Sequence, residues 1–121
     1  MNARRVRAAF IVAGLMFLAV PALAGTPDTV LDLRRDRDVL WAEASVGNGE
    51  ASIVKVLFLA PRRDGRGHKL WQVCRFDHDG ARVYRCGIDV SPRSAASRHA
   101  GDWTVKVRLD GEEVAVKTFA L

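Results

Sequence analysis

Residues 101–121 read GDWTVKVRLDGEEVAVKTFAL, and this stretch decides the fold class. Apolar residues occupy every second position from Trp103 to Leu109, which is typical of a strand with one buried face. Asp110-Gly111 follows and favours a two-residue hairpin turn. On the return, the apolar residues change to the other alternation before Phe119, which predicts a bulge or a change of face near Lys117. The sequence therefore predicts an antiparallel hairpin.

Upstream, five more short apolar segments are separated by turn-forming residues. These segments are Thr29 to Leu33, Val39 to Ser45, Ile53 to Leu59, Lys69 to Phe76 and Arg82 to Val90. The mixed-charge run from Asp32 to Asp38 could form a loop, an edge strand or a short helix, and we favour an exposed loop. About seven short strands predict an all-β fold, an antiparallel immunoglobulin-like β-sandwich, with a small closed barrel as the alternative.

The two cysteines of the chain, Cys74 and Cys86, allow a test of strand register. If they face each other on neighbouring strands, Phe76 faces Tyr84 and an apolar stripe forms around an Asp-Gly turn. We therefore predict a disulfide within one hairpin. That register excludes the disulfide between two sheets that is typical of immunoglobulin domains.

The segments Gly101-Asp102-Trp103-Thr104-Val105 and Leu109-Asp110-Gly111, with the final Phe119, carry a resemblance. They resemble the closing hairpin of bacterial immunoglobulin-like or fibronectin-like accessory domains, in which G-x-W-x-V is followed by D-G and a terminal aromatic residue. Arg93-Ser94 is similar to a segment before that hairpin in an uncharacterised exported family. The resemblance covers the last third of the chain and implies a fold but no catalytic residue.

Residues 1–24 are predicted to be a cleaved signal peptide. Three arginines precede an apolar run from Ala8 to Val20, and Ala22-Leu23-Ala24 provides the small residues that signal peptidase requires. A retained anchor helix is the alternative, but the run is shorter than the roughly 20 residues that cross a bilayer. Cleavage after Ala24 leaves a single β-sandwich domain, residues 25–121, in the periplasm or outside the cell, with no membrane span.

Removal of the signal peptide changes the charge of the protein. The whole chain has 19 basic and 14 acidic residues and a net charge of +5, and three of the basic residues, Arg4, Arg5 and Arg7, leave with the signal. Sixteen basic residues then remain against 14 acidic ones, a net charge of +2. The mature domain therefore lacks the strongly basic character of a nucleic-acid-binding protein, and no nucleic-acid partner is expected.

No catalytic constellation is apparent in the sequence, so we expect neither enzymatic activity nor a cofactor. The serines lie in turns and loops without an aligned base, and the cysteine spacing differs from the C-x-x-C of redox proteins. His68, His78 and His99 could converge on a metal ion, but their spacing matches no ligand motif. We interpret them as three exposed loop histidines and expect no metal site.

Two basic loops are the candidate contact surfaces. The loop from Ser91 to His99 carries Arg93, Ser94, Arg98 and His99, groups that can hold a carboxylate, a phosphate or an acidic glycan. A second cluster consists of Arg62, Arg63, Arg66, His68 and Lys69. Solvated connections between strands are the simpler interpretation of both loops. Three tryptophans, Trp41, Trp71 and Trp103, could stack on a ligand but are expected in the core.

Three functions follow from these features. The first is an exported binding or accessory module of the bacterial envelope that contacts a protein or a cell-wall polymer. The second is an inhibitor or immunity-type protein of a secreted enzyme, although basic wall-degrading enzymes would repel a weakly basic inhibitor. The third is a small metal-binding protein that uses the loop histidines.

Overall fold

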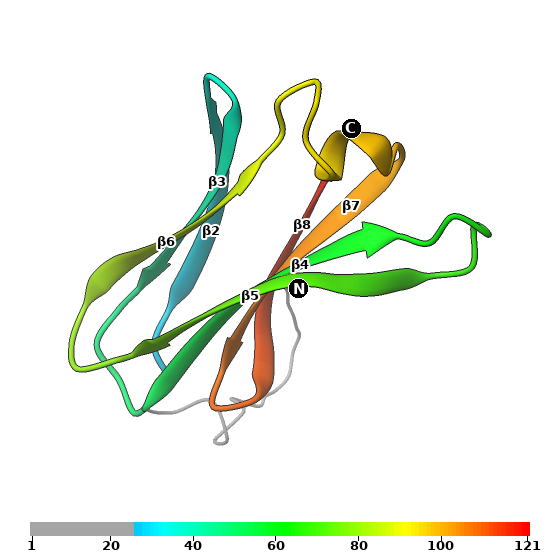
Figure 1. Cartoon of the computed structure of the whole chain (residues 1–121). Coiled ribbons are helices and arrows are strands. Elements are labelled where there is room, and N and C mark those ends of the chain that lie inside the picture. Colours follow the sequence, from blue (N-terminus) through cyan, green and yellow to red (C-terminus); the bar gives the residue numbers. More distant parts are fainter. Residues whose placement is uncertain (1–25) are drawn as a thin grey trace, which may run out of the picture.

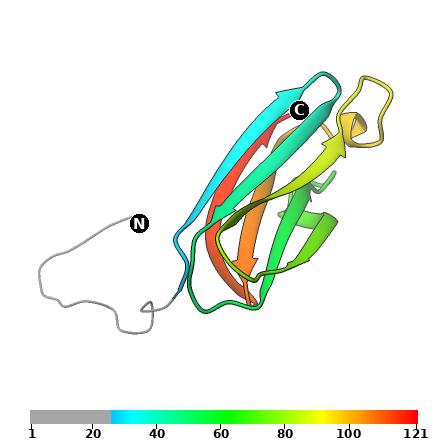
Figure 2. The ribbon, with the colours of Figure 1, turned by 90° about the vertical axis from the view of Figure 1, so that its left-hand side faces the viewer.

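The computed structural model describes residues 26–121, which form seven antiparallel strands in two stacked sheets (Figures 1 and 2). The first sheet has the order β2-β3-β6. Its strands are β2 (Thr29–Asp36), β3 (Val39–Val46) and β6 (Arg82–Asp89). The predicted all-β sandwich of about seven strands is confirmed, and the predicted signal peptide, residues 1–24, lies outside the described residues.

The second sheet has the order β5-β4-β7-β8. Its strands are β4 (Ile53–Pro61), β5 (His68–Asp77), β7 (Asp102–Leu109) and β8 (Glu112–Ala120). A short 3-10 helix, η3 (Ala96–Arg98), lies in the connection from β6 to β7. Within residues 26–121, no helix has the length and apolar character needed to cross a membrane.

The hydrophobic core lies between the two sheets and follows the alternation of the strands. Phe58 and Trp103 are its largest fully buried side chains. On β3, Leu40, Ala42, Ala44 and Val46 are buried, whereas the residues between them face outward. This alternation confirms that pleated strands with one buried face build the sandwich.

The predicted disulfide between Cys74 and Cys86 is confirmed, but its predicted register is wrong. β5 pairs with β4 and β6 pairs with β3, so the disulfide joins an edge strand of one sheet to an edge strand of the other. Phe76 and Tyr84 do meet, with ring centroids 5.0 Å apart, but across the core and not along a hairpin. Apolar residues alternate in the same way in two strands that pair within one sheet and in two strands that face each other across the core. The alternation alone could therefore not distinguish these two arrangements.

Two local predictions also need correction. The charged run expected to be a loop belongs largely to β2, which pairs with β3 as far as Asp36 before a turn at Arg37. Backbone pairing, which needs no apolar side chain, holds this part of an edge strand. In β8 the bulge residue is Val114 and not a residue near Lys117, because Val107 pairs with Ala115 and Arg108 pairs with Glu113.

Candidate anion-binding site

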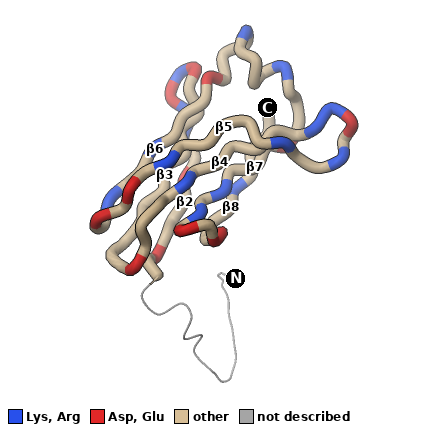
Figure 3. The backbone as a smooth tube through the Cα atoms, turned by 60° about the horizontal axis from the view of Figure 1, so that its bottom comes forward, with Lys and Arg blue, Asp and Glu red and all other residues tan. Residues whose placement is uncertain are grey.

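Two loops meet at one end of the sandwich. One is the hairpin between β4 and β5, where the Arg62 N–H donates to the Gly67 carbonyl at 3.0 Å. The other is the β6–β7 loop, which contains η3. A side chain links the second strand of the hairpin to β7, because Nε2 of His68 donates to the Asp102 carbonyl at 2.9 Å. Lys and Arg residues, drawn in blue, occupy both loops in Figure 3.

Gly101 permits the close approach of these loops. Its φ of 130° is a backbone conformation that residues with side chains rarely adopt. A Cβ atom at this position would lie 3.2 Å from Cγ of Pro61, at the end of β4. Gly101 also exchanges two backbone hydrogen bonds with Leu121, which fixes the start of β7 against the C-terminus. A glycine is therefore required where the two loops come together.

A pocket of about 480 Å³ lies between the loops, and we call it the basic pocket. Its lining residues are Pro61, Arg62, Arg63, Gly65, Arg98, His99, Ala100 and Gly101. The lining contains three arginines and no acidic residue. Asp64 adjoins Arg63 in the chain, but its carboxylate accepts from the Arg66 N–H at 2.8 Å, so within residues 26–121 none of the three arginines forms an ion pair.

The structure thus brings together four of the six residues that the sequence nominated for binding. Arg62, Arg63, Arg98 and His99 share the basic pocket, whereas Arg93 and Ser94 do not line it. The Ser94 hydroxyl donates to the Ser91 carbonyl at 2.7 Å, so it holds the β6–β7 loop in shape. Gly101 was not predicted to contribute to this site, although the sequence places it directly before Asp102 and Trp103.

His99 is the buried group of the basic pocket, with 9 % of its surface exposed. Its ring meets the ring of Trp71 edge-on, with centroids 4.9 Å apart, and its carbonyl accepts a 2.8 Å hydrogen bond from the Trp103 indole. Nδ1 of His99 is buried and has no hydrogen-bond partner among the described residues. Burial lowers the pKa of His99 below its ordinary value, and the charges of Lys69 and Arg63 lower it further.

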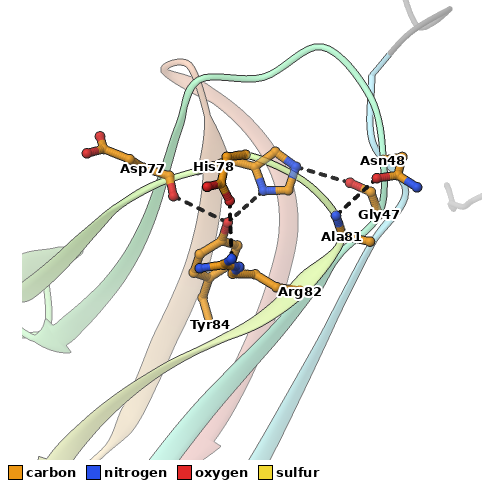
Figure 4. Close-up of polar contacts among 8 residues, drawn as sticks. Gly47, Asn48, Asp77, His78, Ala81, Arg82 and Tyr84 are labelled. Carbon is orange, nitrogen blue, oxygen red and sulfur yellow. Dashed lines mark hydrogen bonds and ion pairs between the residues drawn. The ribbon is translucent and has the colours of Figure 1, made fainter.

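His78 lies at the opposite end of the sandwich, and Figure 4 shows its contacts with Gly47 and Tyr84. β5 begins at His68 and ends directly before His78, and its ten residues span about 30 Å. The alternative in which His68, His78 and His99 share a metal ion is therefore wrong, and no cluster of metal-binding side chains occurs in residues 26–121. The expectation of exposed histidines is wrong for His78 and His99, which are buried, whereas His68 is exposed.

The three tryptophans differ in their environments. Trp103 is fully buried, as expected, and Trp71 packs edge-on against it with centroids 5.2 Å apart. Trp41 points away from the core, on the outer face of the three-stranded sheet, so its expected core position is wrong. There the guanidinium of Arg85 lies 4.2 Å from the Trp41 ring centroid, and Gly87 provides the space for the ring.

No family model and no curated protein matches the sequence. Among solved structures, a β-glucosidase from Kluyveromyces marxianus is similar, with a TM-score of 0.51 and 16 % identity. That match covers 78 % of this chain and 13 % of the enzyme. β-Glucosidase 3B from Thermotoga neapolitana gives a TM-score of 0.48 at 16 % identity, covering 76 % of this chain and 15 % of that one. The chain thus spans a small fraction of these enzymes, and the likeness shows the fold alone.

Proposed function

We propose that this protein is an exported binding or accessory module that holds an anionic group of a protein or an envelope polymer in the basic pocket. The observation that carries the proposal is the convergence of Arg62, Arg63 and Arg98 from two separate loops on one pocket without an acidic residue. Guanidinium groups bind carboxylates and phosphates through paired hydrogen bonds. Such a pocket can retain a ligand without any catalytic group.

The unpartnered Nδ1 of His99 supports a binding role for this end of the molecule. A buried polar atom without a hydrogen bond costs on the order of 1–3 kcal/mol, so proteins rarely keep one without a purpose. An accessory role would also be in keeping with the Kluyveromyces marxianus enzyme, of which the similar region makes up 13 %. Export follows from the predicted signal peptide, and the mature protein should then begin at Gly25 when its N-terminus is sequenced.

Binding is tested by nuclear magnetic resonance titration of the mature protein with inorganic phosphate. We expect the backbone amide shifts to change around Arg63, Arg98 and Gly101. The double variant Arg63→Ala/Arg98→Ala should lose these changes. Its matched control is Arg75→Ala/Arg108→Ala, which removes the same charge from the outer face of the four-stranded sheet. Equal responses in the two double variants would show that the basic pocket is not the site.

The partner is then identified by capture from an envelope extract. Wild-type protein and both double variants are immobilised, and the material retained by each is compared. A protein or polymer that is retained by wild type and by Arg75→Ala/Arg108→Ala, but not by Arg63→Ala/Arg98→Ala, supports the proposal. If the same material is retained by all three proteins, the contact surface lies elsewhere and the proposal fails.

A further inference from the structure

The charge of the basic pocket indicates the class of anion that it fits. Three arginines line it, and Lys69 lies beside it with Nζ 5.9 Å from the ring centroid of Trp71. A carboxylate or a phosphodiester carries one negative charge and would leave most of this positive charge uncompensated. A phosphate monoester carries close to two negative charges near neutral pH and has three oxygens that can accept hydrogen bonds.

The shape of the lining favours the same class. Arg63 comes from the β4–β5 hairpin and Arg98 from the end of η3, so the two arginines line the pocket from different elements. A planar carboxylate pairs best with one fork on one side, whereas a tetrahedral group can accept donors from several directions. Gly65 and Gly101 add no side chains to the lining, which leaves space for a group of this size.

His99 is enclosed by cationic and aromatic groups. Arg63 and Lys69 face it from the hairpin and β5, Arg98 precedes it in the chain, and Trp71 and Trp103 pack on it from β5 and β7. No acidic side chain lines the pocket beside it. The pocket therefore opposes a positive charge on this imidazole, both by burial and by repulsion. A dianion that enters the pocket reverses the repulsion.

We propose that the basic pocket binds the phosphate monoester group of a ligand and that His99 takes up a proton when this group enters. This inference rests on the proposed function and adds the class of ligand and its regulation by pH. Proton uptake and anion binding are reciprocal, so each strengthens the other. The affinity for the dianion should therefore increase as the pH falls through the range in which histidine titrates.

The test follows the ring proton of each histidine by nuclear magnetic resonance across a pH titration. Inorganic sulfate serves as the probe because it is a tetrahedral dianion that does not itself titrate near neutral pH. We expect sulfate to raise the pKa of His99, and acetate at the same ionic strength to raise it much less. His78 is the internal control, because it lies at the other end of the sandwich and its ring nitrogens already have partners.

A variant adds a second measurement. In wild type the affinity for sulfate should rise at least about fivefold between about pH 8 and about pH 5.5. In His99→Gln, which keeps a polar side chain that cannot take up the proton, that rise should be absent. Within each protein the two sulfate affinities are compared as a ratio, so a uniform loss of affinity in His99→Gln does not affect the test.

The outcomes separate the inference from the proposed function. If sulfate shifts the amides of the basic pocket but leaves the titration of His99 unchanged, proton uptake is refuted while anion binding stands. If acetate acts as strongly as sulfate, the assignment to a dianion is refuted. If neither sulfate nor inorganic phosphate shifts the amides of the basic pocket, the proposed function itself fails.

Discussion

The two ends of the sandwich each contain a buried histidine, and the two side chains are held in opposite ways. His78 has a partner for each ring nitrogen: Nε2 donates to the Gly47 carbonyl at 3.1 Å, and Nδ1 accepts from the Tyr84 hydroxyl at 2.7 Å (Figure 4). His99 has a buried Nδ1 without a partner among the described residues, and arginines share its pocket.

The two histidines differ in whether the protein itself completes their hydrogen bonds. A buried polar group with all its hydrogen bonds formed costs little and fixes the local structure. At the His78 end, the network ties the start of the β3–β4 connection at Gly47 to Tyr84 in β6. At the His99 end, the lining arginines form none of the ion pairs in residues 26–121 and one polar atom lacks its hydrogen bond. The proposed binding role of the basic pocket rests on this incomplete network and on its unpaired arginines.

The largest expected effect comes from removing the covalent link between the sheets. Cys74→Ala/Cys86→Ala opens a loop with a sequence separation of 12, which should lower the free energy of unfolding by about 3 kcal/mol. Urea unfolding at neutral pH measures the loss. Because the crosslink lies between β5 and β6 and does not line the basic pocket, the folded variant should still bind sulfate. Loss of sulfate binding in a folded variant would show that the pocket depends on the crosslink.

His78→Ala should have the next largest effect, because it leaves the Tyr84 hydroxyl and the Gly47 carbonyl with one partner fewer in a buried place. We expect the free energy of unfolding to fall by about 2 kcal/mol, with no change in sulfate binding. The control is His68→Ala, which removes an exposed histidine with one hydrogen bond and should cost less. If the two substitutions cost the same, the His78 network does not carry the stability assigned to it.

The contrast between the ends could be predicted only in part from the sequence. The alternation in each segment located the strands, and the position of Trp103 in the core followed from it. Whether β6 pairs with β5 or faces it across the core is decided by long-range packing, which a period of two does not encode. His78 is buried against Tyr84 and Gly47, and His99 is buried against Trp71. These contacts depend on the tertiary fold, so the sequence alone did not indicate them.

Tyr84→Phe should make the two ends of the sandwich more alike. The substitution keeps the aromatic ring against Phe76 but removes the hydroxyl that donates to Nδ1 of His78. The free energy of unfolding should fall by about 1 kcal/mol. Nδ1 of His78 then lacks a partner, as Nδ1 of His99 does. The residue next to His78 is Asp79, however, and no group of arginines surrounds His78 among the described residues. We expect no sulfate binding there, and a sulfate-dependent shift of the His78 ring would contradict the role given to the arginines.

The smallest expected effect is the pH dependence that His99 gives to stability. Its pKa is lowered in the folded protein, mainly by burial, so as the pH falls the unfolded chain takes up the proton first. The contribution of His99 to stability is therefore complete above the ordinary histidine pKa of about 6.5. It decreases as the pH falls from that value to the lowered pKa of the folded state. Urea midpoints measured across this range should fall less steeply in His99→Gln than in wild type.

Sulfate provides the control for this pH effect, because it should favour protonation of His99, which only wild type contains. With sulfate in the basic pocket, protonation of His99 is opposed less, so the acid-side loss of stability should shrink. In His99→Gln, sulfate should stabilise the protein by a similar amount at every pH in the range. Without sulfate, the urea midpoints of wild type and His99→Gln could instead change in parallel with pH. This result would mean that His99 titrates alike in the folded and unfolded states, and that the environment of His99 does not affect its protonation.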